Sequence, residues 1–430
     1  MITDPTQINL VFVQLADVVV LGVHDVAGEA LKVHVELVRT VQGCPTCGVV
    51  AHVKDRYLVE LVDLPIYGRP TRLIWHKRRL RCVEPACPKV SWSEQDPRIA
   101  TMNHQMTDRC GRWMTEQVGR CGRPVSDLAR ELDCDWHTIN DAVVSYGEAL
   151  LADPDRFGVV NFLGLDETAF VRPAPYHRTT FATSIVDVGR AQLLDVVQGR
   201  EAKDATTWLK TQGPVWLQGI KAGSIDLSAT YAKVFNELCP SATLVADPFH
   251  VVKHANAKLD ECRRRVQNEQ LGHRGHKHDP LYRIRRLLVK AHERLDDKGS
   301  EKLTGLLAAG DPHGHVANTY TAKEAVRELY SFVDHELAGT WIDELIGTMK
   351  DTYWPLEVRS LGATLKRWRD EIIAWHKVQI SNGPTEGANN LIKRVKRAAF
   401  GFRSFRNFRV RVLLYAGRPD WSKLATVAPH

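Results

Sequence analysis

Four cysteines in the first quarter of the chain constrain its fold more than any other feature. Two residues separate Cys44 from Cys47 and four separate Cys82 from Cys87, with about three dozen residues between the pairs. Two cysteine pairs joined by a hairpin have the layout of a zinc ribbon. Tetrahedral zinc takes four thiolates and supplies folding energy to a module too small for its own core. We therefore expect structural Zn²⁺ at these four cysteines, with unpaired structural thiols as the alternative.

Composition and charge set the broad class of the protein. A chain of 430 residues is long enough for several domains, and 44% hydrophobic and 25% charged residues are ordinary for a globular protein. The formal charge of +7 permits binding of a polyanion without establishing it. The apolar run at residues 8–23 contains polar residues and lacks a basic leader, and no stretch is long enough to span a membrane. Nine cysteines without a secretion signal then indicate reduced thiols or metal ligands in a cytoplasmic protein.

The segment around the cysteines has the pattern of strands. Residues 1–40 alternate apolar and polar positions, which fits half-buried strands. Between the two cysteine pairs, basic residues are interleaved with Trp75. On a rigid hairpin this pattern suits contact with phosphates, and a solvated strand face is the alternative. The expected DNA contacts in this segment are Arg78, Arg79 and Arg81.

Residues 104–150 are expected to be helical and to end in a helix-turn-helix. A short helix centred on Ala129 is followed by a polar break at residues 133–135, and a second helix then buries Ile139 and Val143. This spacing matches a helix-turn-helix, although ordinary helical hairpins share it. The side chains that the second helix would present to DNA are Trp136, His137, Thr138 and Asn140.

Residues 158–255 change to an α/β pattern. The order of elements is three strands, a helix, a strand, a helix, a strand and a helix, which is the order of a ribonuclease-H-like fold. Asp166 lies on the first strand and Asp226 ends the fourth. Side chains alternate along a strand, so Asp166 and Glu167 are not both expected in one site. A single aspartate at a strand end is most often a turn or cap residue, so the assignment depends on a third acid.

The third acid lies in the segment at residues 381–400. Asn382-Gly-Pro384 suits the start of a helix, and Glu386 falls in its first turn. On a helical wheel Asn390, Lys393 and Arg397 lie within about 40° of Glu386, while apolar residues including Leu391 gather opposite. One carboxylate with cations behind it suits a metal-dependent reaction on a phosphate backbone, and an amphipathic surface helix is the alternative. Together the catalytic candidates are Asp166, Asp226 and Glu386, holding two Mg²⁺ or Mn²⁺ ions.

The remaining segments complete the expected domain organisation. Residues 256–378 are helical and amphipathic and are predicted to be an insertion before the catalytic glutamate. Arginines alternate with aromatic residues after the late helix, which favours a nucleic-acid surface with Lys393, Arg394, Arg397, Arg403 and Arg406 as contacts. The predicted segments are 1–100 (strands and zinc ribbon), 101–152 (helix-turn-helix), 153–255 (first part of the catalytic core), 256–378 (all-α insertion) and 379–430 (last core helix and basic-aromatic tail).

With these motifs in place, the chain resembles bacterial insertion-sequence transposases of the Asp-Asp-Glu type, in the group with a zinc ribbon and a helical insertion. The resemblance spans nearly the whole chain. It is carried by the two cysteine pairs and by Gly164-Leu-Asp-Glu167, Ile225-Asp-Leu-Ser228, Asp247-Pro-Phe-His-Val-Val-Lys253, Ser381-Asn-Gly-Pro-Thr-Glu-Gly-Ala-Asn-Asn390 and 401–414. It implies binding and cutting of terminal inverted repeats, joining of the freed 3′-hydroxyl to target DNA, and the trio Asp166, Asp226 and Glu386. Asp247 and His250 are expected near the site but not as metal ligands.

Two other classes of protein remain open from the sequence. One is a non-catalytic DNA-binding regulator built on the zinc ribbon and helix-turn-helix, and the other is a metal-dependent nuclease that cuts without joining. A transposase joins two ends, so its expected partners are double-stranded DNA, from element ends and target, and further copies of itself in a dimer or larger synaptic complex. Its expected location is the bacterial nucleoid, with no membrane partner.

Overall fold

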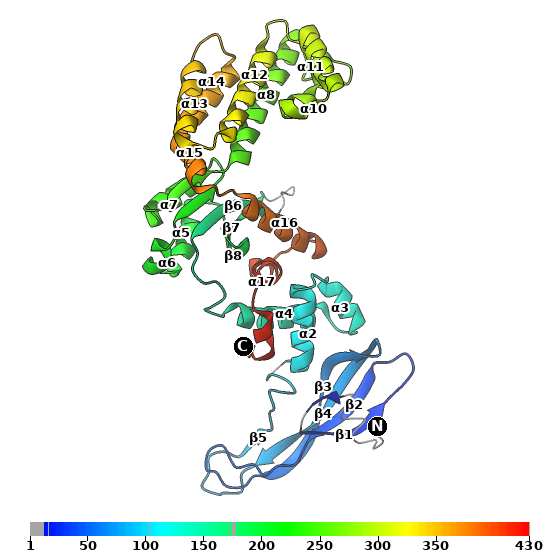
Figure 1. Ribbon diagram of the computed structural model, residues 1–430. Helices are drawn as coiled ribbons and strands as arrows, with labels where there is room; N and C mark the ends of the chain where they lie inside the picture. The colour runs from blue at the N-terminus through cyan, green and yellow to red at the C-terminus, as the bar shows by residue number, and fades with distance from the viewer. Residues whose placement is uncertain (1–12, 16, 103, 172, 174–177, 430) are drawn as a thin grey trace, which may run out of the picture. The chain divides into compact units, whose positions relative to one another are not determined.

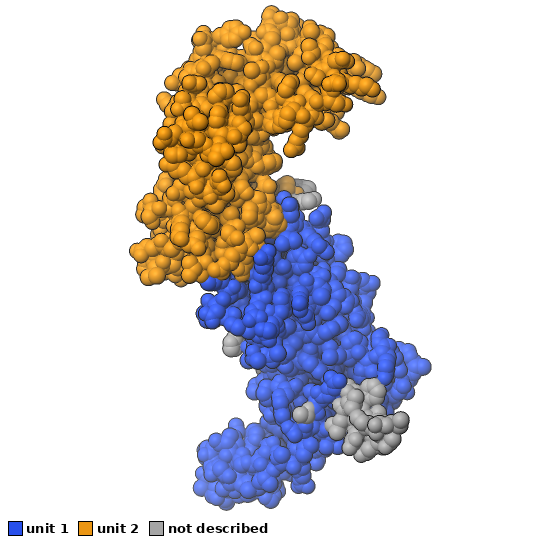
Figure 2. Space-filling view, viewed as in Figure 1, with its two compact units in different colours: residues 1–158, 390–430 blue, residues 159–389 orange. Residues whose placement is uncertain are grey.

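The computed structural model describes residues 13–15, 17–102, 104–171, 173 and 178–429 (Figure 1). The chain divides into two compact units, coloured separately in Figure 2: unit 1 comprises residues 1–158 and 390–430, and unit 2 comprises residues 159–389. Strands expected in residues 1–12 lie outside the described residues. The boundary falls within helix α16 (Gly383–Ala398), so the expected catalytic helix begins in unit 2 and ends in unit 1.

Unit 1 opens with a five-stranded sheet in the order β1-β2-β4-β3, with β5 paired to β4. Its strands are β1 (Val18–His24), β2 (Leu31–Leu37), β3 (His52–Ile66), β4 (Arg69–Arg81) and β5 (Ser91–Ser93). Tyr67 and Gly68, both at positive φ, make the two-residue turn between β3 and β4, a geometry that matches the twist of paired strands. Val35, Leu73 and Trp75 are fully buried between the strands and their neighbours. The hairpin expected between the cysteine pairs is therefore present, and it has its own small core.

A group of helices forms the rest of unit 1. They are α2 (Asp108–Gly119), α3 (Val125–Glu131), α4 (Trp136–Leu151), α17 (Phe405–Ala416) and the 3₁₀ turn η3 (Trp421–Ala425). The polar break between α3 and α4 contains Asp133 at a φ of 49°. Leu128 and Ile139 on either side of it are fully buried in a shared core. The late helix α17 packs closely on α4, because a side chain at Gly147 would come within 2.8 Å of Val410.

Unit 2 contains a second five-stranded sheet, in the order β10-β9-β6-β7-β8. Its strands are β6 (Phe162–Val171), β7 (Thr180–Asp187), β8 (Gln192–Gln198), β9 (Ala222–Ile225) and β10 (Thr243–Ala246). The first three pair antiparallel in sequence, whereas β9 and β10 add in parallel to the other edge of β6. The connecting helices are α5 (Ala202–Thr211), α6 (Pro214–Gln218) and α7 (Ala229–Leu238). The observed order of strands and helices matches the order read from the sequence except for the short helix α6, which follows α5 and was not predicted.

Two glycines show which helix covers which face of this sheet. A side chain at Gly223 of β9 would collide with Phe235 of α7, and one at Gly164 of β6 would collide with Thr385 of α16. In the parallel register Gly164 is opposite Ser224, so Gly164 and Gly223 point to opposite faces. Helix α7 therefore covers one face, and the first half of α16 covers the other.

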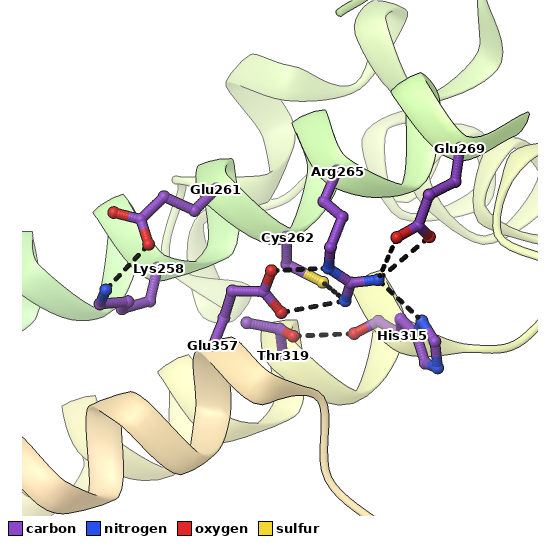
Figure 3. A network of polar contacts seen from close by, with 8 residues as sticks. All are labelled: Lys258, Glu261, Cys262, Arg265, Glu269, His315, Thr319 and Glu357. Carbon is purple, nitrogen blue, oxygen red and sulfur yellow. Dashed lines mark hydrogen bonds and ion pairs between the residues drawn. The ribbon is translucent and has the colours of Figure 1, made fainter. Parts of the chain in front are cut away.

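A helical region lies between the last strand and α16, as the sequence predicts (Figure 1). It contains α8 (Pro248–Leu271), α9 (Pro280–Arg283), α10 (Arg285–Leu288), η1 (His292–Arg294), α11 (Asp297–Gly310), α12 (His315–Glu328), η2 (Leu329–Ser331), α13 (His335–Thr348), α14 (Leu356–Arg367) and α15 (Arg369–Val378). Figure 3 shows how polar side chains tie α8 to α14: Arg265 makes two bonds of 2.8 and 3.0 Å to buried Glu357 and also reaches Glu269. None of the helices in the described ranges is both long and apolar enough to cross a bilayer.

Candidate active site and zinc centre

The four cysteines of unit 1 lie in one cluster. Cys44 Sγ is 3.8 Å from Cys87 Sγ, Cys47 Sγ is 3.5 Å from Cys82 Sγ, and all four sulfurs lie within 4.8 Å of one another. Tetrahedral zinc with Zn–S bonds of about 2.3 Å needs sulfurs about 3.8 Å apart. Over the residues that the structure describes, no other group of three or more His, Cys, Asp or Glu ligand atoms is gathered as tightly. The cluster fits the predicted structural zinc.

The backbone around Cys44 already favours a thiolate. Gly48, at a φ of 78°, closes the turn by donating its N–H to the Cys44 carbonyl at 2.9 Å. Burial acts against ionisation of Cys44, but hydrogen bonds from the N–H groups of Cys47 and Thr46 and from the thiols of Cys47 and Cys82 together lower the pKa of Cys44 to about 6. A thiolate is the form that binds zinc, so these contacts favour the binding form at Cys44.

In unit 2, Asp166 and Asp226 come together on adjacent parallel strands. Gly164 and Ser224 are the last paired residues, and Asp166 and Asp226 each follow them by two positions, close enough for the charge of Asp226 to act on Asp166. Side chains two residues apart share a face, so both carboxylates lie on the face that α16 covers. Asp226 directly follows the last residue of β9, at its carboxyl end. This is the edge at which open α/β sheets place their ligands.

Glu386 reaches the same site from the first turn of α16, and a histidine links it to Asp226. His250, in the first turn of α8, places Nδ1 3.0 Å from Asp226 Oδ2 and Nε2 3.0 Å from Glu386 Oε1. The imidazole is only 13% exposed, whereas the Glu386 side chain is 41% exposed. The structure therefore brings the predicted trio to one end of the sheet, with His250 between two of its members.

Two asparagines from the α16 segment hold the strand carboxylates. Asn389 donates to Asp166 Oδ2 at 2.6 Å, and Asn382 donates to Asp226 Oδ1 at 2.8 Å. Asp247 does not join the trio. It accepts the backbone N–H of Asn382 at 2.8 Å and caps α8, which fixes the start of α16 against β10. Asp247 is thus an anchor for the helix that carries Glu386, in line with its expected place near the site.

The two aspartates are short of compensating positive charge. Burial, and next the charge of Asp226, raise the pKa of Asp166 to about 6. Burial is also the largest cause of the raised pKa of Asp226. A cation placed between two such carboxylates stabilises their ionised forms. The oxygen donors of Asp166, Asp226 and Glu386 are of the kind that Mg²⁺ and Mn²⁺ prefer, so the residues fit such an ion.

An open cavity of about 850 Å³ borders the two aspartates. Its lining also includes Glu167, which the sequence analysis placed on the opposite side of β6 and therefore outside the site. The alternation holds along the strand, but the pairing of β6 with β9 ends at Gly164. Beyond that point β6 pairs only with β7 among the described strands, and the cavity reaches both Asp166 and Glu167.

The predicted DNA contacts of the zinc-ribbon hairpin differ in their surroundings. Arg78 is 4% exposed and binds buried Glu94, so its guanidinium does not reach solvent. Arg79 pairs with Asp55 at 3.3 Å and is half exposed. Arg81 is exposed and lines a cavity of about 550 Å³ beside the cysteine knuckles. Of the three, Arg81 is the most available to an anion.

The α4 contacts also divide into exposed and buried residues. Trp136 and His137 are exposed at the start of the helix, and Thr138 bonds to Gln105. Asn140 is 5% exposed and accepts a hydrogen bond from Asn407 of α17, so it faces the interior of unit 1. The sequence could not reveal this, because the packing partner lies 267 residues later.

The late basic residues are mostly exposed. Lys393, Arg394, Arg397 and Arg403 all reach the surface of unit 1. Arg406 is exposed as well, but its guanidinium makes bonds of 2.6 and 2.5 Å to Glu148 of α4. This ion pair helps to fix α17 on α4, so Arg406 has a structural role in addition to the predicted one.

Sequence reasoning missed the roles of His250, Asn382 and Asn389. His250 and Asn382 stand in stretches already singled out, but nothing in their spacing shows that they bridge or hold carboxylates. Asn389 had a usable signal, because it lies three residues after Glu386 and therefore on the same side of the helix. The wheel drew attention to Asn390, which is exposed in the structure.

Comparison with known proteins identifies the family of the chain. Residues 163–412 match a transposase domain family, and residues 40–87 match the zinc finger of the transposases of IS204, IS1001, IS1096 and IS1165. The transposase of insertion sequence IS1001 from Bordetella parapertussis is 25% identical over 398 residues, covering 90% of this chain and 91% of that protein. The transposase of IS1557 from Mycobacterium tuberculosis is 31% identical over 289 residues, 63% of each chain.

Among solved structures, the chain is similar to the transposase of a Drosophila P element strand transfer complex. The similarity has a TM-score of 0.38 with 10% identity, covering 75% of this chain and 93% of the other, and this is too low to support an inference. The family match is different in kind, since it covers more than half of the chain and includes β6 to α17. The chain belongs to the ISL3 family of insertion-sequence transposases, with both the transposase domain and the zinc ribbon of that family.

Proposed function

We propose that this transposase cuts the ends of its element by metal-dependent hydrolysis of a phosphodiester and joins the freed 3′-hydroxyl to target DNA. The observation that carries the proposal is the link between acids from three separate elements at one end of the sheet. His250 contacts both Asp226 and Glu386, and Asn389, one turn after Glu386, donates to Asp166. The sheet order β10-β9-β6-β7-β8 supports a ribonuclease-H-like core, in which acids from these positions act together.

In this proposal the three carboxylates hold two Mg²⁺ or Mn²⁺ ions. Such ions, when bound, polarise the phosphodiester and favour ionisation of the attacking water or hydroxyl. The chain's own contribution is to fix the donors. Asn389 donates to one oxygen of Asp166, and the backbone N–H of Glu167 donates to the other. In the same way, Asn382 donates to one oxygen of Asp226, and His250 contacts the other. The open cavity gives the DNA backbone access to these groups.

His250 has a positioning role in the same proposal. Its ring contacts carboxylates from β9 and α16 at once, so it holds Glu386 toward Asp226. Asp247 supports this arrangement from behind by anchoring the backbone of Asn382. Together these contacts hold the three acids at one end of the sheet without a cation, and a bound ion would replace some of these hydrogen bonds.

For DNA binding, we propose that the zinc ribbon and a helix-turn-helix formed by α3 and α4 read the element end. Trp136 and His137 stand exposed at the start of α4, where a recognition helix contacts bases. Arg81 and the exposed cations Lys393, Arg394, Arg397 and Arg403 would contact phosphates. Joining two ends also calls for at least a dimer on the DNA.

A strand-transfer assay distinguishes this proposal from its two alternatives. Purified protein is incubated with Mg²⁺, supercoiled plasmid and a labelled duplex from the flank of its gene, ending in a 3′-hydroxyl. Label joined covalently to plasmid is the expected result, and it should disappear in Glu386→Gln. Cutting without joining would indicate a nuclease. Binding without either reaction would indicate a regulator.

A further inference from the structure

The cavity beside Asp166 and Asp226 is lined by two cations that the proposed catalytic trio does not explain. Arg200 lies in the turn between β8 and α5, and Lys233 lies in the second turn of α7. Both belong to unit 2 and border the same space of about 850 Å³ as the two aspartates. Carboxylates that bind metal repel a DNA phosphate, so a DNA substrate needs positive groups of this kind close by.

Arg200 is held by an aromatic ring and has only one long ion pair. Its guanidinium carbon lies 4.3 Å from the centre of the Phe181 ring on β7, a stacking contact that fixes the plane of the group. Its nearest carboxylate oxygen, on Glu167, is 3.8 Å from Nη1, beyond hydrogen-bond distance. The side chain remains 55% exposed. A stacked guanidinium with unfilled N–H groups is well suited to a phosphate oxygen.

Lys233 differs from the other lysines near it. On the neighbouring helix, Lys203 pairs with Glu201 at 2.8 Å and Lys210 pairs with Glu237 at 3.2 Å. Lys233 is exposed and has no carboxylate partner among the residues that the structure describes. A lysine that lines a cavity without a partner is available to an anionic ligand.

We propose that Arg200 and Lys233 form a phosphate-binding subsite that holds a DNA phosphate adjacent to the one that is cut. This inference rests on the proposed function and extends it, because it assigns substrate-positioning residues outside the acid trio. The ligand is a phosphodiester anion of the DNA strand that occupies the cavity. The subsite holds that strand while the carboxylates act on the next linkage.

Neutral linkages in the DNA test the contact directly. A methylphosphonate is placed in turn at each phosphate around the mapped cut, and cleavage rates are measured for the full-length chain with Mg²⁺. One neutral linkage should slow the parent about ten-fold, as expected for loss of a charge-assisted hydrogen bond. In the Arg200→Gln/Lys233→Gln double variant, unmodified DNA should be cut about ten-fold more slowly, and that linkage should cause no further loss. Each single variant should lose part of the rate and part of the sensitivity to that linkage.

Lys210→Gln is the matched control, because Lys210 lies on the adjacent helix and does not line the cavity. It should keep both the parental rate and the parental sensitivity to the neutral linkage. Equal sensitivity in Lys233→Gln and the parent would overturn the subsite. Both cations are exposed, so the variants should melt with the parent, and melting curves check this.

A binding measurement separates failure of the subsite from failure of the proposed function. Anisotropy of a labelled flank duplex is followed in EDTA over a range of salt concentrations. The affinity falls as salt rises, and each phosphate contact makes this fall steeper. Loss of one phosphate contact in the Arg200→Gln/Lys233→Gln double variant should therefore reduce the magnitude of the slope of log affinity against log salt by about 0.9, relative to Lys210→Gln. An unchanged slope would overturn the subsite even if the parent cuts DNA. No cutting by the parent, with the slope reduced, would overturn the proposed reaction alone.

Discussion

The two candidate metal centres of this chain are prepared by the fold in opposite ways. In unit 1 the four sulfurs of the zinc cluster all lie within 4.8 Å of one another, and two of the pairs are 3.5 and 3.8 Å apart. In unit 2 every acid is already engaged: Asp166 by Asn389, Asp226 by Asn382 and His250, and Glu386 by His250. The cysteines form a ready tetrahedral cage, whereas the acids form a hydrogen-bonded arrangement that opens on a cavity.

This difference follows from what each metal does. Structural zinc holds together the cysteine turns, which lie outside the small core of the sheet, so its ligands need no other support when the metal is bound. A catalytic ion must bind and stay accessible to substrate, so its ligands are fixed by the protein instead. Removing metal should therefore unfold part of unit 1 but leave unit 2 folded. The following predictions test that contrast.

The largest effect is expected at the zinc cluster. Cys82→Ser removes one of four ligands, so bound zinc should fall well below one per chain, with loss of a binding free energy of order 10 kcal/mol. The region from β1 to β5 should then become sensitive to limited proteolysis, while the fragment from β6 onward stays resistant. Cys121→Ser is the control, since Cys121 is exposed and lies outside the cluster. Full zinc content in Cys82→Ser would contradict the assignment.

The next largest effect concerns the acid site. Asp226→Asn removes a charge needed for metal but keeps the size of the side chain, so DNA cutting should fall by roughly a thousand-fold or more, about 4 kcal/mol. Binding of end DNA should be spared. In the comparison variant Asp247→Asn, the amide oxygen can still accept the N–H of Asn382, so at least a tenth of the activity should remain. Parental activity in Asp226→Asn would move the second acid to Asp247.

Ionisation of Asp166 should lower the free energy of unfolding of the metal-free chain. Its pKa is raised from 3.8 to about 6, so the folded chain keeps a proton that the unfolded chain loses as pH rises between these values. The penalty is absent below about pH 4 and complete above about pH 6, where it reaches at most about 3 kcal/mol. Asp166→Asn should therefore melt a few degrees higher than the parent at pH 8 in EDTA, with no difference near pH 4.

Mg²⁺ sharpens this prediction. It should raise the melting temperature of the parent at pH 8 and close most of the gap to Asp166→Asn. A variant that melts below the parent at pH 8 would show that Asp166 is stabilised as an anion by groups other than a metal.

A smaller effect is expected from His250→Ala. The change removes the ring that contacts both Asp226 and Glu386, so the metal-free chain should lose about 1 to 2 kcal/mol, seen as a melting temperature a few degrees lower. Mg²⁺ should restore more stability in the variant than in the parent, since the two carboxylates then lack their other partner. His278→Ala, at an exposed position, should behave as the parent. Equal melting of His250→Ala and the parent in EDTA would contradict the positioning role.

The sequence reveals the zinc centre almost completely because its ligands are set by short spacings. Cys44 and Cys47 share one turn, and the register of a single hairpin brings Cys82 and Cys87 to them. The acids are predictable for a related reason. Asp166 lies on β6, Asp226 directly follows β9 and Glu386 lies in the first turn of α16, so the order of elements alone indicates where each belongs.

What the sequence could not supply depends on distant packing. Leu391 falls on the apolar side of the helical wheel but is 38% exposed, because the buried side of α16 is fixed by its contacts with the sheet and not by its own pattern. Asn140 and Arg78 look like surface contacts until Asn407 and Glu94 are placed beside them. Arg200 and Lys233 carry no motif, and only the fold brings them to the cavity of the aspartates.

The central claim is that Asp166, Asp226 and Glu386 together cut DNA at the ends of the element. The most direct test uses DNA from both flanks of the gene, incubated with Mg²⁺ and either the parent or Glu386→Gln, with nicks mapped to single nucleotides. Glu344→Gln, on an exposed part of α13, serves as control. We predict nicks at a repeated end sequence with the parent and the control and none with Glu386→Gln. Identical nicks in all three, or DNA that is bound but uncut in all three, would contradict the account.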